Sequence, residues 1–243
     1  MARPGASGSW WHGVAALLLG VGCALTSAGA FAQRDLSLGV FYFPGWRDDA
    51  PGAPAAKPWQ RIKDFPERKP LLGWYDEGND DVMRLQLEWM IQYGLQFVVF
   101  DWYWANDGRV MLDHALAAYF RAPQRTKLPF ALLWANHGDV PSSQNNFDQM
   151  ISWWVKYYAA RSEFLRVDGK PVVFIYSSQD LAARAKVFGT TTQQLLAGAQ
   201  KRARDAGLPG FYFVAGVTGD TPDLLREARA MGYSAVSAYN LHA

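Results

Sequence analysis

An acid stands among large aromatic residues in the segment VVFDWYWAND, which runs from Val98 to Asp107. Asp101 ends a run of apolar residues, and an isolated buried carboxylate is costly, so this side chain must find a partner or face a site. Aromatic rings beside acids and amides suit a sugar, whose C–H faces pack on rings while its hydroxyl groups bond to polar side chains. The segment predicts carbohydrate binding, and core packing is the alternative for any single tryptophan.

The same combination recurs where other predicted strands end and in the first long loop. Alternation along a strand puts Asp101 and Tyr103 on one side and Trp102 and Trp104 on the other, so not all four can face one ligand. The candidate substrate-binding residues are Tyr42, Trp46, Trp74, Asp76, Asp101, Trp102, Trp104, Trp134, Asn136, Tyr176 and Tyr239. Asp76 and Asp101 are the fallback candidates for a catalytic acid.

Six apolar runs alternate with amphipathic stretches, which is typical of β/α units around a parallel sheet. The predicted strands are 36–43, 95–102, 129–136, 172–176, 211–216 and 234–239, and the predicted helices are 81–93, 109–121, 146–158, 192–206 and 222–231. Because sites form at the carboxyl ends of parallel strands, the aromatic and acidic residues should meet at one end of the sheet. We expect an α/β fold, a (β/α)8 TIM-type barrel truncated after about six β/α units. A six-unit open sheet is the alternative.

The first 32 residues differ from the rest of the chain. A basic lead with Arg3 precedes an apolar run, residues 14–25, and Ala30 and Ala32 fit an A-x-A cleavage site. This order predicts a secretory signal peptide over residues 1–32, with an uncleaved anchor or a lipoprotein at Cys23 as alternatives. We therefore expect a periplasmic or extracellular protein, without a membrane segment after cleavage, whose single barrel domain covers residues 33–243.

Several other classes of function lack their usual marks. The net charge is +2 and basic residues are scattered among acids, so nucleic acid is not an expected partner. The four histidines show no metal-ligand spacing, and His137 is expected to be a hydrogen-bonding loop residue. No Walker loop, G-x-G-x-x-G after a strand or G-x-S-x-G elbow occurs, so we expect neither a cofactor nor a metal.

Five segments in order, GVFYFPGW, PLLGWYDEGNDDVMRLQLEWMIQYGLQFVVFDWYW, LPFALLWANH, LRVDGKPVVFIY and MGYSAVSAYN, resemble glycoside hydrolase family 99-like proteins. That group includes endo-acting α-mannosidases and mannanases, together with WbsX-like proteins found with lipopolysaccharide biosynthesis. The resemblance covers residues 39–240 and implies a (β/α)8 barrel with a sugar-binding cleft. Trp134 and Asn136 match the W-A-N of the WbsX-like branch, where the mannosidase branch has an acid and a tyrosine.

The resemblance also implies where catalysis resides. The family's general acid/base lies in a segment resembling N-E-W-x-E-G, with a second glutamate nearby, and no such segment occurs here. Because glycoside cleavage uses two carboxyl groups across the bond, we expect the catalytic glutamates beyond Ala243. We therefore expect an exported glycoside hydrolase acting on a polysaccharide, of α-mannan type by resemblance. The alternatives are a WbsX-like protein that makes surface polysaccharide and a barrel that binds carbohydrate without cleaving it.

Overall fold

The computed structural model describes residues 36–47, 57–217 and 223–239 of the chain. The chain divides into residues 1–36 and residues 37–243, and every element below belongs to the second unit. The predicted signal peptide lies outside the described residues. Among the described helices, none combines the length and hydropathy needed to cross a bilayer.

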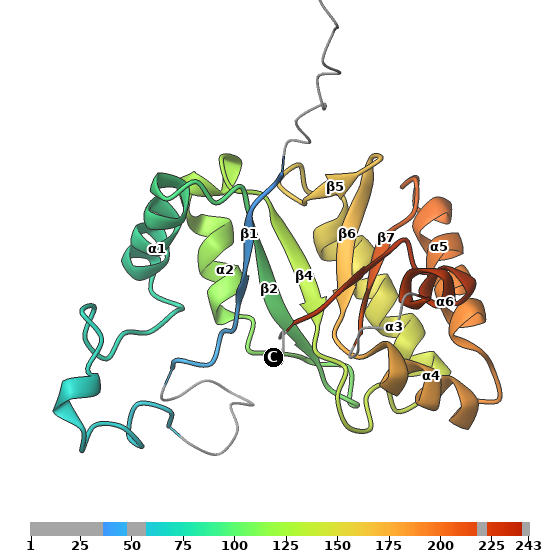
Figure 1. Cartoon of the computed structure of the whole chain (residues 1–243), viewed down its shortest axis with the longest axis horizontal. Helices are drawn as coiled ribbons and strands as arrows, with labels where there is room; N and C mark the ends of the chain where they lie inside the picture. Colours follow the sequence, from blue (N-terminus) through green and yellow to red (C-terminus); the bar gives the residue numbers. More distant parts are fainter. Residues whose placement is uncertain (1–35, 48–56, 218–222, 240–243) are drawn as a thin grey trace, which may run out of the picture. The chain divides into compact units, whose positions relative to one another are not determined.

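Six parallel strands form the sheet, as the apolar runs predict (Figure 1). They are β1 (Gly39–Tyr42), β2 (Phe97–Trp104), β4 (Phe130–Trp134), β6 (Lys170–Ile175), β7 (Tyr212–Gly216) and β8 (Ala235–Ser237). They stand side by side in chain order, whereas the order reverses at a switch point in a doubly wound sheet. This progression and the curl of the sheet are those of a half-barrel.

Two short strands pair antiparallel at the ends of the long ones. The strand β3 (Val110–Met111) folds back on the end of β2, and β5 (Arg166–Val167) pairs with the start of β6. Val110 and Met111 therefore belong to a hairpin, although the sequence predicted a helix from residue 109. That helix begins only at His114, because the preceding residues bond to β2.

The helices pack on one face of the sheet, where most of the apolar core lies. They are α1 (Asp80–Gln92), α2 (His114–Arg121), α3 (Gln144–Trp154), α4 (Ser178–Val187), α5 (Thr192–Asp205) and α6 (Leu224–Ala230). A π-helical turn, Val155–Ala159, continues α3, and 3₁₀ turns occur at Pro66–Arg68 and Pro123–Thr126. The helix α4 was not predicted, since it buries only Leu181, Ala185 and Ser178 and shows little apolar periodicity.

The second face of the sheet, which we call the inner face, carries a smaller apolar cluster. Val99, Ala131, Leu133, Val172 and Val214 are its buried members. These residues alternate along each strand with the residues that point to the helices, as both-face burial in a parallel sheet requires. The inner face is therefore the face on which a barrel would place its interior.

Candidate functional site

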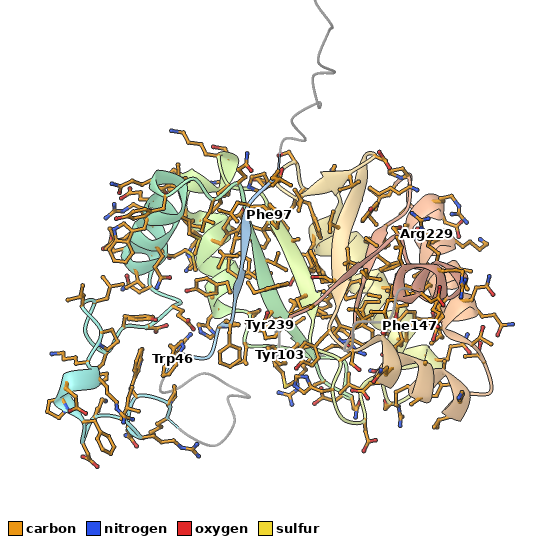
Figure 2. All side chains as sticks on the ribbon, viewed as in Figure 1. Trp46, Phe97, Tyr103, Phe147, Arg229 and Tyr239 are labelled. Carbon is orange, nitrogen blue, oxygen red and sulfur yellow. The ribbon has the colours of Figure 1, made fainter. Side chains whose placement is uncertain are left out.

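Polar and aromatic side chains gather on the inner face near the carboxyl ends of the strands. Tyr103 contacts His137, His137 contacts Tyr176, and Tyr176 contacts Tyr239, with ring centroids 5.9, 5.5 and 5.4 Å apart. Figure 2 shows Tyr103 and Tyr239 at the same end of the strands. We call these four residues and Asp101 the inner layer.

Asp101 is the acid of the inner layer and is 6% exposed. The hydroxyl of Tyr239 donates a 3.0 Å hydrogen bond to its Oδ2. Its Oδ1 is buried and has no hydrogen-bond partner among the described residues. Burial raises the pKa of Asp101 from 3.8 to about 6, against the lowering effect of the Tyr239 hydrogen bond. The carboxylate is therefore half satisfied, because one oxygen accepts a hydrogen bond and the other accepts none among the described residues.

Tyr103 and Tyr239 of the inner layer are held as neutral phenols. Burial raises the pKa of Tyr239 to about 12, and the neighbouring Asp101 adds to this shift. The pKa of Tyr103 is raised further, by burial first and then by Asp101 and the other two tyrosines. Each hydroxyl can therefore donate or accept a hydrogen bond at neutral pH. The layer offers rings, neutral hydroxyl groups and one carboxylate oxygen to a ligand.

Backbone contacts hold the strand end that carries Tyr176. A Cβ on Gly216 would lie 2.0 Å from the carbonyl oxygen of Tyr176, so only glycine lets β7 approach β6 so closely at this point. The hydroxyl of Ser178 also donates a 2.9 Å hydrogen bond to the carbonyl oxygen of Gly216. Tyr176 is thus placed by the ends of two neighbouring strands.

Trp102 and Trp104 point away from the inner layer, as the alternation of the strand predicts. Both are buried in the helix-side core, and their rings are stacked 5.7 Å apart. The ring of Trp102 also packs on Trp154 of α3, 5.5 Å away, and its indole nitrogen donates to the hydroxyl of Tyr158. The structure therefore places both tryptophans against helices, on the other side of the strand from Asp101.

Trp134 and Tyr42 also lie on the helix side. Trp134 is fully buried and packs on Phe147 and Trp154 of α3. The hydroxyl of Tyr42 donates a 2.6 Å hydrogen bond to Gln86 of α1. Burial raises the pKa of Tyr42, and the nearby Glu77 adds to the effect. Both side chains are parts of the core in this structure, so neither joins the inner layer.

Asn136 has a bridging role that occupies both ends of its amide. Its Nδ2 donates a 2.8 Å hydrogen bond to the carbonyl oxygen of Ser177, and its Oδ1 accepts one of the same length from the Ser177 amide. The side chain is completely buried. Asn136 therefore ties the end of β4 to the start of α4, and its role as a substrate ligand stays a prediction.

Trp46 and Trp74 belong to a separate aromatic cluster in the first long loop. Both rings pack on Trp59, with centroids 4.6 and 5.5 Å away, and Tyr75 packs on its other side. Trp59 is 3% exposed and its indole donates a 2.7 Å hydrogen bond to the carbonyl oxygen of Tyr75. The sequence reasoning missed Trp59, although its place in a Pro-rich loop between Trp46 and Trp74 was a usable signal.

The buried acid of this loop is Glu77, the neighbour of the predicted Asp76. Oε2 of Glu77 accepts a 2.8 Å hydrogen bond from the backbone amide of Trp46 and lies 3.6 Å from Nε2 of His114. Asp76 is half exposed, lies 3.5 Å from Arg47 and accepts from the amide of Gly78. The structure brings Asp76 and Glu77 to the loop, whereas Asp101 belongs to the inner layer.

No metal centre is evident in the parts of the chain that the structure describes. No three histidine, cysteine, aspartate or glutamate side chains there come together as ligands. His137 is exposed and contacts Tyr103 and Tyr176 through its ring, so it stands at the rim of the inner layer.

The model of the family described as "Glycosyltransferase WbsX" matches residues 54–241, most of the chain. The chain belongs to the WbsX family. This membership agrees with the resemblance of its ordered segments to WbsX-like and family 99-like proteins. Asp101, Tyr176 and Tyr239 of the inner layer lie within the matched residues.

Two curated relatives share part of the WbsX-family chain. Both are called "Uncharacterized protein WxcX", from the B100 and ATCC 33913 strains of Xanthomonas campestris pv. campestris, and each is 29% identical over 118 residues. The match covers 43% of this chain and 17% of each relative. The WbsX-family chain thus corresponds to a small part of those proteins.

Two solved structures have a similar fold. The GH99 endo-alpha-mannosidase from Bacteroides thetaiotaomicron, in complex with BIS-TRIS-propane, has a TM-score of 0.59 and 17% identity, and the match covers 84% of this chain and 58% of that one. A second structure of the GH99 endo-alpha-mannosidase from this organism has a TM-score of 0.57 and 16% identity, with 84% and 61% covered. The parallel curled sheet is thus that of a family 99-like domain.

Proposed function

We propose that the inner layer binds a glycan and that the whole protein hydrolyses a glycosidic bond in a polysaccharide. The observation that carries this proposal is the unpartnered Oδ1 of Asp101 beside the rings of Tyr103, Tyr176 and Tyr239. A sugar hydroxyl is a donor of the right kind for this oxygen, and the half-buried rings offer faces for its C–H groups. WbsX-family membership supports a glycan as the substrate class.

Asp101 serves in this proposal as a ligand for sugar hydroxyl groups. A donor to Oδ1 stabilises the ionised form, so the bound sugar lowers the pKa of Asp101 below about 6. By linkage, protonation of Asp101 opposes binding, and affinity falls as the pH drops below that value. Tyr239 holds the carboxylate in place from its other oxygen.

Hydrolysis of a glycosidic bond needs a second carboxyl group beside that of Asp101. Glycosidases flank the bond with two carboxyl groups, and the described inner layer contains one, that of Asp101. We include in the proposal a closed (β/α)8 barrel in the whole protein, whose remaining β/α units add the catalytic glutamates. The match to 58% of the similar mannosidase chain supports this extension. An α-mannan-type substrate and export after removal of residues 1–32 belong to the same proposal.

A second candidate function is transfer of a sugar in surface polysaccharide synthesis. It is favoured by the description of the family as a glycosyltransferase. Sequence evidence for export weighs against it, because nucleotide sugars are cytoplasmic donors and no nucleotide-binding motif occurs. The two functions share a glycan-binding inner layer. They differ in the molecule that supplies the sugar, which is the polysaccharide in hydrolysis and a nucleotide sugar in transfer.

The test is to incubate the whole protein with α-mannan and to measure released reducing ends, beside an assay of sugar transfer from nucleotide sugars. Hydrolysis that is lost in Asp101→Asn and retained in Asp205→Asn supports the proposal. Asp205 is the matched control, because it lies on α5, paired with Lys201 at the surface. Transfer without hydrolysis would establish the second candidate, and retention of glycan without any product would make the protein a binding module.

A further inference from the structure

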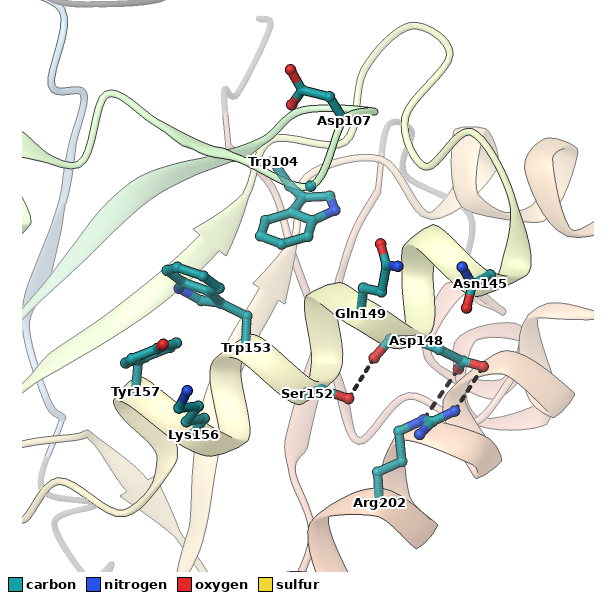
Figure 3. A pocket seen from close by; sticks show the side chains of 11 residues that line it. Trp104, Asp107, Asn145, Asp148, Gln149, Ser152, Trp153, Lys156, Tyr157 and Arg202 are labelled. Carbon is teal, nitrogen blue, oxygen red and sulfur yellow. Dashed lines mark hydrogen bonds and ion pairs between the residues drawn. The ribbon is translucent and has the colours of Figure 1, made fainter.

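A groove of about 510 Å³ lies on the helix side of the molecule, apart from the inner face. Its walls come from the β2–β3 turn, from α3 with the π-helical turn, and from Arg202 of α5 (Figure 3). Its volume falls within the range of about 300 to 1,000 Å³ that is usual for small-molecule sites. We call it the outer groove, and nothing in the proposed reaction uses it.

An aromatic pair forms one wall of the outer groove. The rings of Trp153 and Tyr157 lie 4.3 Å apart at 43°, and Tyr157 is 40% exposed. A second hollow of about 160 Å³ shares both residues, so the pair stands as a ridge between two depressions. Tyr157 lies in the π-helical turn, Val155–Ala159, a local geometry that is frequent at functional sites.

Gln149 of α3 and the indole of Trp104 also line the outer groove. The indole nitrogen of Trp104 is buried without a hydrogen-bond partner among the described residues, and Figure 3 draws it on the side of Gln149. Gly108 lines this end with φ +84°, and a Cβ there would make ordinary contacts, 3.7 Å from Oε1 of Gln149 and 3.9 Å from the ring of Trp104. The groove is thus lined by an amide side chain as well as by aromatic rings.

The charges of the outer groove balance one another. Arg202 pairs with Asp148 at 2.8 Å, and Asp107 pairs with Arg109 at 2.7 Å. Lys156, the remaining cation in the lining, stands 4.8 Å over the ring of Tyr157. A groove for phosphate or nucleic acid would carry unpaired cations along its length. Rings, amides and balanced charges instead suit a neutral polyhydroxyl ligand.

We propose that the outer groove is a second glycan-binding site, which holds a neutral stretch of the polysaccharide on Trp153 and Tyr157. This inference rests on the proposed function for the identity of the polymer. A chain bound at two places on one protein dissociates more slowly, because release from one site leaves it at high effective concentration near the other. The outer groove would therefore keep a long polymer on the protein while the inner layer acts on it.

The test is affinity electrophoresis of the protein and its variants through gels that contain α-mannan, dextran or acidic polygalacturonate. In Tyr157→Ala and in Trp153→Ala, the affinity for a neutral polymer should fall about tenfold. This is the effect of losing one ring contact worth about 1.4 kcal/mol. Tyr93→Ala and Trp89→Ala are the matched controls, because these exposed aromatics lie at the end of α1 and in α1. The controls should be retained like the unmodified protein.

Two comparisons separate this inference from the proposed function. Asp101→Asn should lose product release while the outer groove still retains the polymer. If Tyr157→Ala and Trp153→Ala melt at the temperature of their controls and are retained equally well, the outer groove is not a glycan site. Absence of neutral-polymer retention in the unmodified protein, or stronger retention on polygalacturonate, would also overturn the inference. Ring-dependent retention without any hydrolysis would support the outer groove and refute the hydrolase proposal.

Discussion

Tyr239 and Asp101 are joined by a 3.0 Å hydrogen bond although 138 residues separate them in the chain. Asp101 belongs to β2, and Tyr239 follows β8, at the other side of the sheet order. The ring of Tyr239 also lies 5.0 Å from that of Phe41 in β1. The sheet therefore curls far enough for its two outer strands to share one layer of side chains, and the candidate site depends on this curl.

Asp101→Asn should stabilise the fold at neutral pH while it abolishes glycan binding at the inner layer. The folded pKa of about 6 lies above the ordinary 3.8, so ionisation costs folded-state stability as the pH rises through this interval. At about 1.4 kcal/mol for each pH unit, the gain in Asp101→Asn reaches at most about 3 kcal/mol at pH 7.5 and vanishes below pH 4. Urea unfolding at a series of pH values measures it.

Asp205→Asn is the control for this series, because its carboxylate is exposed and paired with Lys201. A gain in unfolding free energy that is the same at pH 4 and pH 7.5 would show that Asp101 is not destabilised by its charge. A loss at pH 7.5 would mean that the carboxylate has a partner that the structure lacks. Stability gained at the expense of function is a recurrent property of active sites.

Tyr239→Phe should raise the pKa of Asp101 above about 6. The hydroxyl of Tyr239 donates to the carboxylate and so favours its ionised form, and the phenylalanine ring keeps the contact with Phe41. A carbon-13 titration of the Asp101 carboxyl group measures the change. Tyr212→Phe, on the inner face of β7, is the control and should leave the titration in place. An unchanged or lowered pKa in Tyr239→Phe would contradict the geometry.

The order of strands could be predicted from the sequence because each central strand is a continuous apolar run. The same property hides which face of each strand packs on the helices and which belongs to the inner face. In residues 97–104 both faces are covered, so the apolar residues alone do not mark the side on which the helices pack. Alternation separates Asp101 from Trp102, as the structure confirms, but only the packing of Trp102 on Trp154 assigns the tryptophan to the helix side.

The candidate site could be predicted only in part, because the role of a polar side chain depends on the partners that it meets in the fold. An asparagine at a strand end can bind a ligand or bridge two loops, and the choice for Asn136 depends on Ser177, 41 residues later. The missed Glu77 adjoins Asp76, and their roles differ only because the amide of Trp46 meets one carboxylate and not the other. Long-range partners of this kind leave no mark in local residue patterns.

Trp134→Ala should cost stability and spare glycan affinity. The side chain is fully buried between Phe147 and Trp154, so truncation leaves a cavity and should lower the unfolding free energy by about 3 to 5 kcal/mol. Tyr176→Ala, in the half-buried inner layer, should show the opposite balance, with weaker binding and a smaller loss of stability. Calorimetric titration with α-mannan at low temperature, beside chemical unfolding, compares them. If a folded Trp134→Ala protein lost glycan affinity, Trp134 would be a glycan-binding residue.

Glu77→Ala should loosen the loop that carries Trp46. The substitution leaves the backbone amide of Trp46 without its 2.8 Å acceptor and removes the carboxyl group 3.6 Å from His114, at a cost of about 1 to 3 kcal/mol. Glu77→Gln keeps a neutral acceptor and should lose less. Limited proteolysis of the loop and unfolding by urea measure both effects, with Asp76→Ala as the half-exposed neighbouring control. Equal protease sensitivity of Glu77→Ala and Asp76→Ala would deny Glu77 its role in holding Trp46, since burial is what distinguishes the two acids.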